Sequence, residues 1–309
     1  MKIDHELASI TPQGETLLTI GVFDGVHAGH RYLVRRLRQQ AAKENLLSGV
    51  VTFNPHPQSV LHPACELPWL SDLDDRITTL QQLGLDVVTV LTFTPKLAQL
   101  SARDFMSLLR KYLKMRGVIV GPDFVLGRGG EGNIGLLRTL GDDMKFTVDV
   151  VPPFTIEGEV VSSTLIRQAL ARGDMSRVEK SMGRRFYLKG KVITSNKRGR
   201  LLGFPTANLD IKPQQALPDN GIYATITLVN GERFPSATNV GTRPTFGKGQ
   251  RMVETHLLNY KGDLYGKEIR VEFVKKVRDE QRFPSTDQLV VQMGKDVQEV
   301  DAILAKDLK

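Results

Sequence analysis

The chain has 309 residues, of which 40% are apolar and 25% charged, with a net charge of +8 and one cysteine, Cys65. This length exceeds the usual size of a single domain, so two domains are expected. One cysteine excludes an internal disulfide, and no group of Cys and His has zinc spacing. The start has no apolar signal core, and no apolar run approaches the roughly 18 residues of a membrane span. These features favour a soluble, cytoplasmic protein.

The first half alternates apolar strands with helical patterns. The strands are expected at residues 17–22, 48–53, 87–91, 117–120 and 146–151. The helices are expected near residues 30–44, 71–83, 101–115 and 134–140. Strands this apolar, separated by helices, predict a parallel sheet covered on both faces, which is a Rossmann-like α/β fold.

A glycine-rich turn joins the first strand to the first helix, and its sequence runs Gly-Val-Phe-Asp-Gly-Val-His-Ala-Gly-His from Gly21 to His30. The spacing of His27 and His30 lets both imidazoles face one ligand. The free N–H groups and positive dipole end of the following helix favour an anion there. Because open α/β sheets bind ligands at the carboxyl ends of their strands, the turn is predicted to bind a polyphosphate.

A second candidate phosphate motif is Val-Ser-Ser-Thr-Leu-Ile-Arg at residues 161–167, which precedes a helical pattern. Ser162 or Ser163 can cap that helix, and the hydroxyl and N–H groups can hold phosphate oxygens. The guanidinium of Arg167 can bind such oxygens through two parallel hydrogen bonds.

From about residue 186 the pattern changes to short strands at 187–193, 221–228, 233–238, 253–258 and 268–276. Close turns without intervening helices predict an antiparallel barrel or sandwich. An amphipathic helix near 286–304 follows, with an apolar stripe expected to pack on the strands. The domain boundary is placed at 182/183, giving domains 1–182 and 183–309.

The net positive charge of the chain lies in the second domain. Residues 1–182 carry as many basic as acidic side chains, so residues 183–309 hold the whole excess, and the run from Arg184 to Arg200 has no acidic residue. Such a domain attracts polyanions, which could be nucleic acid, a membrane or nucleotide phosphates; the alternative is a solvated surface with no partner.

Residues 200–209 of the second domain read Arg-Leu-Leu-Gly-Phe-Pro-Thr-Ala-Asn-Leu. Thr206 and Asn208 alternate onto one side of an extended segment, and their oxygens could ligate a hard cation such as Mg²⁺. Farther along, Asn239 lies in a second polar segment. Glu254 interrupts an apolar strand, so it is either a surface residue or a general base.

These motifs resemble those of the bifunctional bacterial riboflavin kinase/FAD synthetase family, and the resemblance covers nearly the whole chain. It rests on the His-x-x-His turn, Asn54-Pro55-His56, Gly121-Pro122-Asp123-Phe124, the Ser-Ser-Thr segment, the Lys197-Arg-Gly-Arg lead-in and Gly203-Phe204-Pro205-Thr206-Ala207-Asn208.

The resemblance implies two reactions. In the barrel, ATP would phosphorylate riboflavin to FMN, with Glu254 as base, Mg²⁺ on Thr206 and Asn208, and substrates at Lys197, Gly203, Phe204, Pro205 and Asn239. In the α/β domain, FMN would attack the α-phosphorus of ATP to give FAD and pyrophosphate.

The resemblance also assigns the site of the second reaction, in which His27 and His30 would stabilise charge. ATP would bind to Gly21, Phe23, Asp24, Ser162, Ser163, Thr164 and Arg167. The flavin would bind to Asn54, Pro55, His56, Asp123 and Phe124. Riboflavin, FMN and ATP are therefore the expected partners, and a monomer or weak homo-oligomer without a membrane partner is expected.

Three alternatives remain open. The family often has an acidic residue where Asn54 stands and a different loop after Phe124, so the adenylyltransferase domain could be inactive. The basic half could instead bind nucleic acid, but it lacks a stripe of aromatics and a recognition motif. The glycines at 127, 129 and 132 imitate a dinucleotide fingerprint, but they lie late in the domain and precede a short helix, which disfavours a dehydrogenase.

Overall fold

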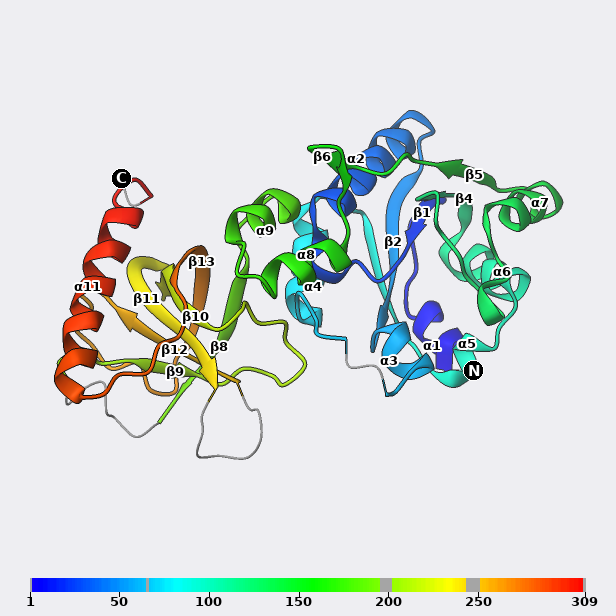
Figure 1. Ribbon diagram of the computed structural model, residues 1–309. Helices are drawn as coiled ribbons and strands as arrows, with labels where there is room; N and C mark the ends of the chain where they lie inside the picture. The colour runs from blue at the N-terminus through cyan, green and yellow to red at the C-terminus, as the bar shows by residue number, and fades with distance from the viewer. Residues whose placement is uncertain (1, 65–66, 195–201, 243–250, 308–309) are drawn as a thin grey trace. The chain divides into compact units, whose positions relative to one another are not determined.

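The computed structural model describes residues 2–64, 67–194, 202–242 and 251–307 (Figure 1). The chain divides into two compact units, Met1–Ser163 and Thr164–Lys309. Each unit is built on a main β structure of its own.

The first unit is built on a parallel sheet with the strand order β3-β2-β1-β4-β5. Its strands are β1 (Thr16–Ile20), β2 (Leu47–Asn54), β3 (Val87–Thr92), β4 (Met115–Val120) and β5 (Thr147–Val150). The long helices between them are α2 (Ala28–Lys43), α4 (Leu73–Gln82), α6 (Ala102–Leu113) and α7 (Ile134–Met144). The predicted parallel α/β fold is confirmed.

Several short elements complete this unit. They are α1 (Lys2–Ala8), the 3-10 turn η1 (Asp24–Val26), α3 (Pro57–Leu61), α5 (Pro95–Ala98), η2 (Arg128–Gly130), and a two-stranded ribbon of β6 (Thr155–Ile156) and β7 (Glu159–Val160).

Neighbouring residues of each strand supply the two opposite faces of the sheet. Leu18 and Val51 belong to an apolar cluster with Leu109 of α6. Leu17 belongs to another with Leu37 of α2. Because successive side chains of a strand point to opposite faces, helices must cover both sides, and the strands are apolar throughout.

The second unit is built on a closed antiparallel barrel with the strand order β10-β11-β12-β9-β8-β13. Its strands are β8 (Tyr187–Ile193), β9 (Ala207–Leu209), β10 (Gly221–Val229), β11 (Glu232–Thr242), β12 (Arg251–Leu257) and β13 (Glu268–Arg278). Two helices, α8 (Ser163–Leu170) and α9 (Met175–Met182), precede the barrel, and α11 (Thr286–Leu304) follows it. The predicted barrel with a C-terminal helix is confirmed.

A chain of buried hydroxyl groups runs through the interior of the barrel. The Oγ1 atoms of Thr225 and Thr238 lie 2.7 Å apart, and Thr238 donates to Thr255 Oγ1 at 2.9 Å. All three threonines are fully buried. Each hydroxyl therefore has a partner inside the core, which offsets the cost of burying it.

Helix α11 packs on the outside of β10, β11 and β13, where Val300 and Leu304 join an apolar cluster with Ala224 and Ile226. A buried ion pair reinforces the contact. Arg278 Nε and Nη2 donate to the two carboxylate oxygens of Asp296 at 2.8 and 2.7 Å. Gln292 Nε2 donates to the same carboxylate at 2.9 Å.

Candidate functional sites

The predicted residues of the first unit gather beyond the carboxyl ends of β1, β2 and β4 (Figure 1). Residues 21–30 follow β1, residues 54–56 end and follow β2, and residues 121–124 follow β4. The strand order reverses between β1 and β4, and such switch points bind ligands in open α/β sheets.

The turn after β1 is held in an unusual backbone conformation. Phe23, Gly25 and Val26 have φ angles of 56°, 76° and 39°. A Cβ atom on Gly25 would lie 2.9 Å from Leu70 Cβ, so only glycine fits there. The Gly25 N–H donates to Ser71 Oγ at 3.0 Å. Residues 21–30 are called the phosphate turn below.

The Asp24 carboxylate is buried within the phosphate turn. It accepts hydrogen bonds from the backbone N–H groups of Leu70 at 3.0 Å and Ser71 at 3.2 Å. The side chain thus fixes the turn to the segment that leads into α4.

His27 and His30 stack on one another at the start of α2. Their ring centroids are 3.7 Å apart with an interplanar angle of 19°. His27 is the N-cap of α2, and its Nδ1 accepts a long hydrogen bond of 3.4 Å from the His30 N–H. Among the described residues, His30 Nδ1 is buried without a hydrogen-bond partner. The site therefore holds a buried polar nitrogen that a substrate oxygen could engage.

Burial lowers the pKa of His30 well below its usual value of 6.5, and the nearby positive charges of His27 and Arg76 lower it further. The free site thus favours a neutral imidazole at His30. An anionic ligand would favour the protonated form.

The second phosphate motif meets the first at its N-terminal end. Ser163 Oγ donates to the Asp24 carbonyl oxygen at 3.2 Å. A Cβ atom on Gly29 would lie 3.2 Å from both the His27 ring and the Val161 carbonyl oxygen. Residues more than 130 positions apart in sequence thus lie in contact.

The other residues of this motif continue into α8, which begins at Ser163. Ser162 and Arg167 are half-buried, and Thr164 is exposed.

The predicted flavin segment follows β2. The Asn54-Pro55 peptide bond is cis, and His56 caps α3 by accepting from the Gln58 N–H at 3.1 Å. After β4, Asp123 is exposed and Phe124 packs against the apolar cluster of the sheet. Asp123 is thus available to a ligand, whereas part of Phe124 serves the core.

In the second unit, three predicted residues form one row across neighbouring strands. Asn208 of β9 is the register partner of Glu254 in β12, and Glu254 is the partner of Asn239 in β11. The adjacent residues Val253 and Thr255 are buried in the barrel, so the row lies on its outer face. Directly opposed side chains are about 5 Å apart. The carboxylate is therefore flanked by two amides, a group called the amide–carboxylate row below.

Asn239 Oδ1 is buried and has no hydrogen-bond partner among the described residues. A carbonyl oxygen left in this state costs about 1–3 kcal/mol, which a ligand donor or a cation would recover. The orphaned oxygen is the strongest structural indication that this row binds a ligand.

The Gly-Phe-Pro-Thr segment lies beside β12. His256 Nδ1 is 2.8 Å from the Pro205 carbonyl oxygen, and the rings of His256 and Phe204 meet edge to face at 5.6 Å. Thr206 is half-buried one residue before β9, and Gly203 is exposed. The predicted residue Lys197 and much of the basic run lie outside the described residues.

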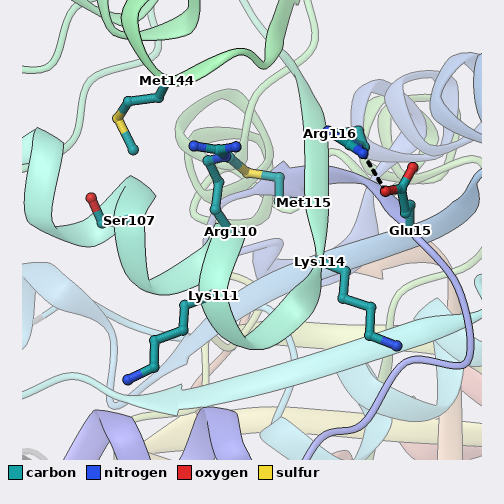
Figure 2. Close-up of a pocket in the computed structure, with 8 residues that line it drawn as sticks. All are labelled: Glu15, Ser107, Arg110, Lys111, Lys114, Met115, Arg116 and Met144. Atoms are coloured by element: carbon teal, nitrogen blue, oxygen red, sulfur yellow. Dashed lines mark ion pairs between the residues drawn. The ribbon is translucent and has the colours of Figure 1, made fainter.

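A cavity of about 470 Å³ lies in the first unit, at the end of β4 opposite to residues 121–124 (Figure 2). Its wall includes the basic side chains of Arg110, Lys111, Lys114 and Arg116, of which Arg116 pairs with Glu15 at 2.5 Å. None of the predicted site residues lines it.

Taken together, a parallel sheet with a His-x-x-His phosphate turn and a barrel with a Thr-Ala-Asn segment define a two-domain ATP-dependent transferase. The family model of FAD synthetase matches residues 9–165, and that of riboflavin kinase matches residues 182–304. The chain belongs to the bifunctional riboflavin kinase/FMN adenylyltransferase family. It phosphorylates riboflavin to FMN and then adenylylates FMN to FAD, as the sequence predicted.

Similar proteins cover nearly the whole chain. The bifunctional riboflavin kinase/FMN adenylyltransferase of Escherichia coli K12 is 38% identical over 94% of this chain and 93% of its own length. The Bacillus subtilis protein of the same name is 34% identical over 93% and 92%. A Streptococcus pneumoniae structure described as a macrolide-efflux protein matches with a TM-score of 0.87 and 29% identity, covering 96% of each chain. Within the described part of this chain, no helix is both long and apolar enough to span a membrane.

Proposed function

We propose that the phosphate turn and the second phosphate motif form the adenylyltransferase site. FMN phosphate, which is already ionised, attacks the α-phosphorus of ATP and releases pyrophosphate, so no general base is needed. His27 and His30 stabilise the charge that develops on the α-phosphate and the leaving group. The contact between Ser163 and Asp24, together with the unpartnered His30 Nδ1, supports this assignment.

The proposed ligands of the triphosphate are Ser162, Ser163, Thr164 and Arg167 of the second phosphate motif, and Gly21 and Phe23 shape the phosphate turn. Asp24 acts through its bonds to the backbone of Leu70 and Ser71. The flavin binds near Asn54, Pro55, His56, Asp123 and Phe124, all of which lie at or beyond the carboxyl ends of β2 and β4.

For the kinase, the proposed base is Glu254, which accepts the proton of the riboflavin 5′-hydroxyl as that oxygen attacks the γ-phosphorus of ATP and ADP leaves. The two amides of the amide–carboxylate row orient the carboxylate and the substrates. Lys197 and the segment from Gly203 to Pro205 belong to the same proposed site. The orphaned Asn239 oxygen carries the assignment.

The residues of the row and its neighbour Thr206 fit a magnesium ion. A hydroxyl and carboxamide oxygens are hard donors, which Mg²⁺ prefers, and phosphate oxygens would complete its shell. Thr206 and Asn208 would hold the ion, and its chemistry there is to neutralise charge on the transferred phosphoryl group.

The proposed domain boundary is 182/183, with the adenylyltransferase in residues 1–182 and the kinase in residues 183–309. The start of the riboflavin kinase family match at residue 182 supports this boundary, whereas the division into compact units falls earlier, between Ser163 and Thr164, and groups α9 with the barrel. A cytoplasmic location, a monomer or weak homo-oligomer, and the absence of nucleic-acid binding stay predictions from the sequence.

The two sites are tested by exchanging one residue in each. His30→Ala is expected to lower FAD formation from FMN by a factor of about 10²–10³ and to leave riboflavin phosphorylation intact. Glu254→Gln is expected to do the reverse. Chromatography of the flavins formed with ATP and Mg²⁺ measures both activities. Equal loss of both activities in either folded variant would contradict the assignment of separate sites.

A further inference from the structure

A segment outside the predicted motifs contacts the phosphate turn. This segment runs from Leu70 to Arg76, the last of which lies in the first turns of α4. Its backbone N–H groups bind the Asp24 carboxylate, and its Ser71 hydroxyl accepts from the Gly25 N–H at 3.0 Å. The turn is therefore held by several hydrogen bonds from one distant stretch of chain.

Arg76 completes this arrangement, since its planar guanidinium spans the ends of two strands. Nη1 donates to the Val22 carbonyl oxygen at 2.7 Å, and Nη2 donates to the Phe53 carbonyl oxygen at 3.1 Å. Val22 follows β1 and opens the phosphate turn, and Phe53 precedes the Asn54-Pro55-His56 segment. One side chain thus connects the two segments assigned to ATP and to the flavin.

The residue is also a buried cation. Arg76 is 6% exposed, and its Nε has no hydrogen-bond partner among the described residues. Asp24 and Asp72 interact favourably with its charge, whereas burial opposes that charge and lowers the pKa of the guanidinium. A buried charge persists only where it is compensated, and a bound polyanion would add compensation from the ligand side.

We propose that Arg76 is a positioning residue for the adenylyltransferase reaction. Its two guanidinium hydrogen bonds, called the fork below, hold the phosphate turn next to the Asn54-Pro55-His56 segment. Its positive charge favours binding of the anionic substrates. The inference rests on the site proposed above. A lysine cannot reproduce the fork, because an ammonium group is a point charge on a flexible stem.

The effect of the Arg76 charge can be measured through the pKa of His30. The charged and titratable groups that act on this imidazole are His27, which stacks on it, and Arg76. Asp24 and Asp72 in turn interact with Arg76. Since a nearby cation disfavours protonation, removing the Arg76 charge is expected to raise the pKa of His30.

The test compares Arg76→Lys, which keeps the charge and loses the fork, with Arg76→Met, which loses both. Arg103→Met, on the surface and paired with Asp143, is the matched control. For each full-length variant, kcat and KM for ATP are measured in FAD synthesis from FMN. The pKa of His30 is measured by NMR titration, with its signal assigned by its loss in His30→Ala.

Both Arg76 variants are expected to lower kcat, by about tenfold for lysine and about 100-fold for methionine, since misplacement by an ångström costs on this order. Only Arg76→Met should raise KM for ATP and the pKa of His30. Riboflavin phosphorylation should be unchanged in all variants.

Two results would overturn the inference. A kcat for Arg76→Lys within twofold of wild type would show that the two hydrogen bonds of the fork are not needed for positioning. If Arg76→Met does not fold, Arg76→Lys alone decides whether the inference holds. Unchanged KM and His30 pKa in a folded Arg76→Met would exclude the role of the charge. If His30→Ala itself retains FAD synthesis, the proposed site fails rather than the role of Arg76.

Discussion

The ion pair between Arg278 and Asp296 should control the thermal stability of the kinase unit. Asp296→Ala removes three accepted hydrogen bonds and leaves the Arg278 guanidinium without its carboxylate. The side chains of Asp296 and Arg278 are only 6% and 16% exposed, so little water can replace the lost partner. Breaking a buried pair in this way costs about 3–5 kcal/mol. A loss of about 3 kcal/mol lowers the melting temperature of a unit of this size by roughly 6–12 °C.

The assay measures the two activities that remain after heating. Riboflavin phosphorylation reports on the kinase unit, and FAD synthesis reports on the adenylyltransferase unit. Asp296→Ala should lose riboflavin phosphorylation at a lower temperature than wild type while FAD synthesis from added FMN persists. The matched control is Glu268→Ala, which breaks an exposed pair with Lys189 in the same barrel and should cost less than about 1 kcal/mol.

A double variant, Arg278→Met with Asp296→Leu, should recover most of the lost stability, because no unpaired charge is left behind. If Asp296→Ala melts like Glu268→Ala, or the double variant is no better than the single one, the reasoning about the buried pair is wrong.

Three further predictions concern the sites and the barrel core. Gly29→Ala should lower FAD synthesis at least tenfold with the kinase unaffected, because a Cβ there would press on the His27 ring, and a wild-type rate would contradict this contact. Asn239→Leu should raise the unfolding free energy by about 1 kcal/mol, since it removes an unpartnered oxygen, yet impair riboflavin phosphorylation in the same flavin assay. Burial raises the pKa of Tyr223 to about 12, so absorbance titration should show one tyrosine ionising there that Tyr223→Phe lacks. Stability from this group should be complete below pH 10 and fall as the pH rises toward 12.

Much of the fold could be predicted because the signals are local. Apolar strands that alternate with helices predict the parallel sheet. The glycines around His27 and His30 predict the turn between β1 and α2, and the expected end of the strand and start of the helix lie within two residues of the observed ones. The N-terminal helix α1 was not predicted, since a short polar segment has no recognisable pattern and depends on tertiary contacts. Its Glu6, for example, accepts hydrogen bonds from Thr92 at the end of β3.

The parts of the sites that escaped prediction depend on long-range pairing. Arg76 looks like an ordinary surface residue of a helix, because no local pattern shows that the carbonyl groups of Val22, after β1, and Phe53, in β2, face it. The alignment of Asn208, Glu254 and Asn239 likewise depends on register, which a single sequence does not specify.

The threonine chain inside the barrel has a consequence for how insertions can be tolerated. Thr238 and Thr255 are register partners one position away from Asn239 and Glu254. A shift of one residue in either strand would exchange the two faces, burying the carboxylate and turning the hydroxyl groups outward. The hydrogen bonds between the buried threonine hydroxyl groups therefore favour the observed register of the strands. A single residue inserted within β11 or β12 would therefore disrupt both the threonine core and the amide–carboxylate row.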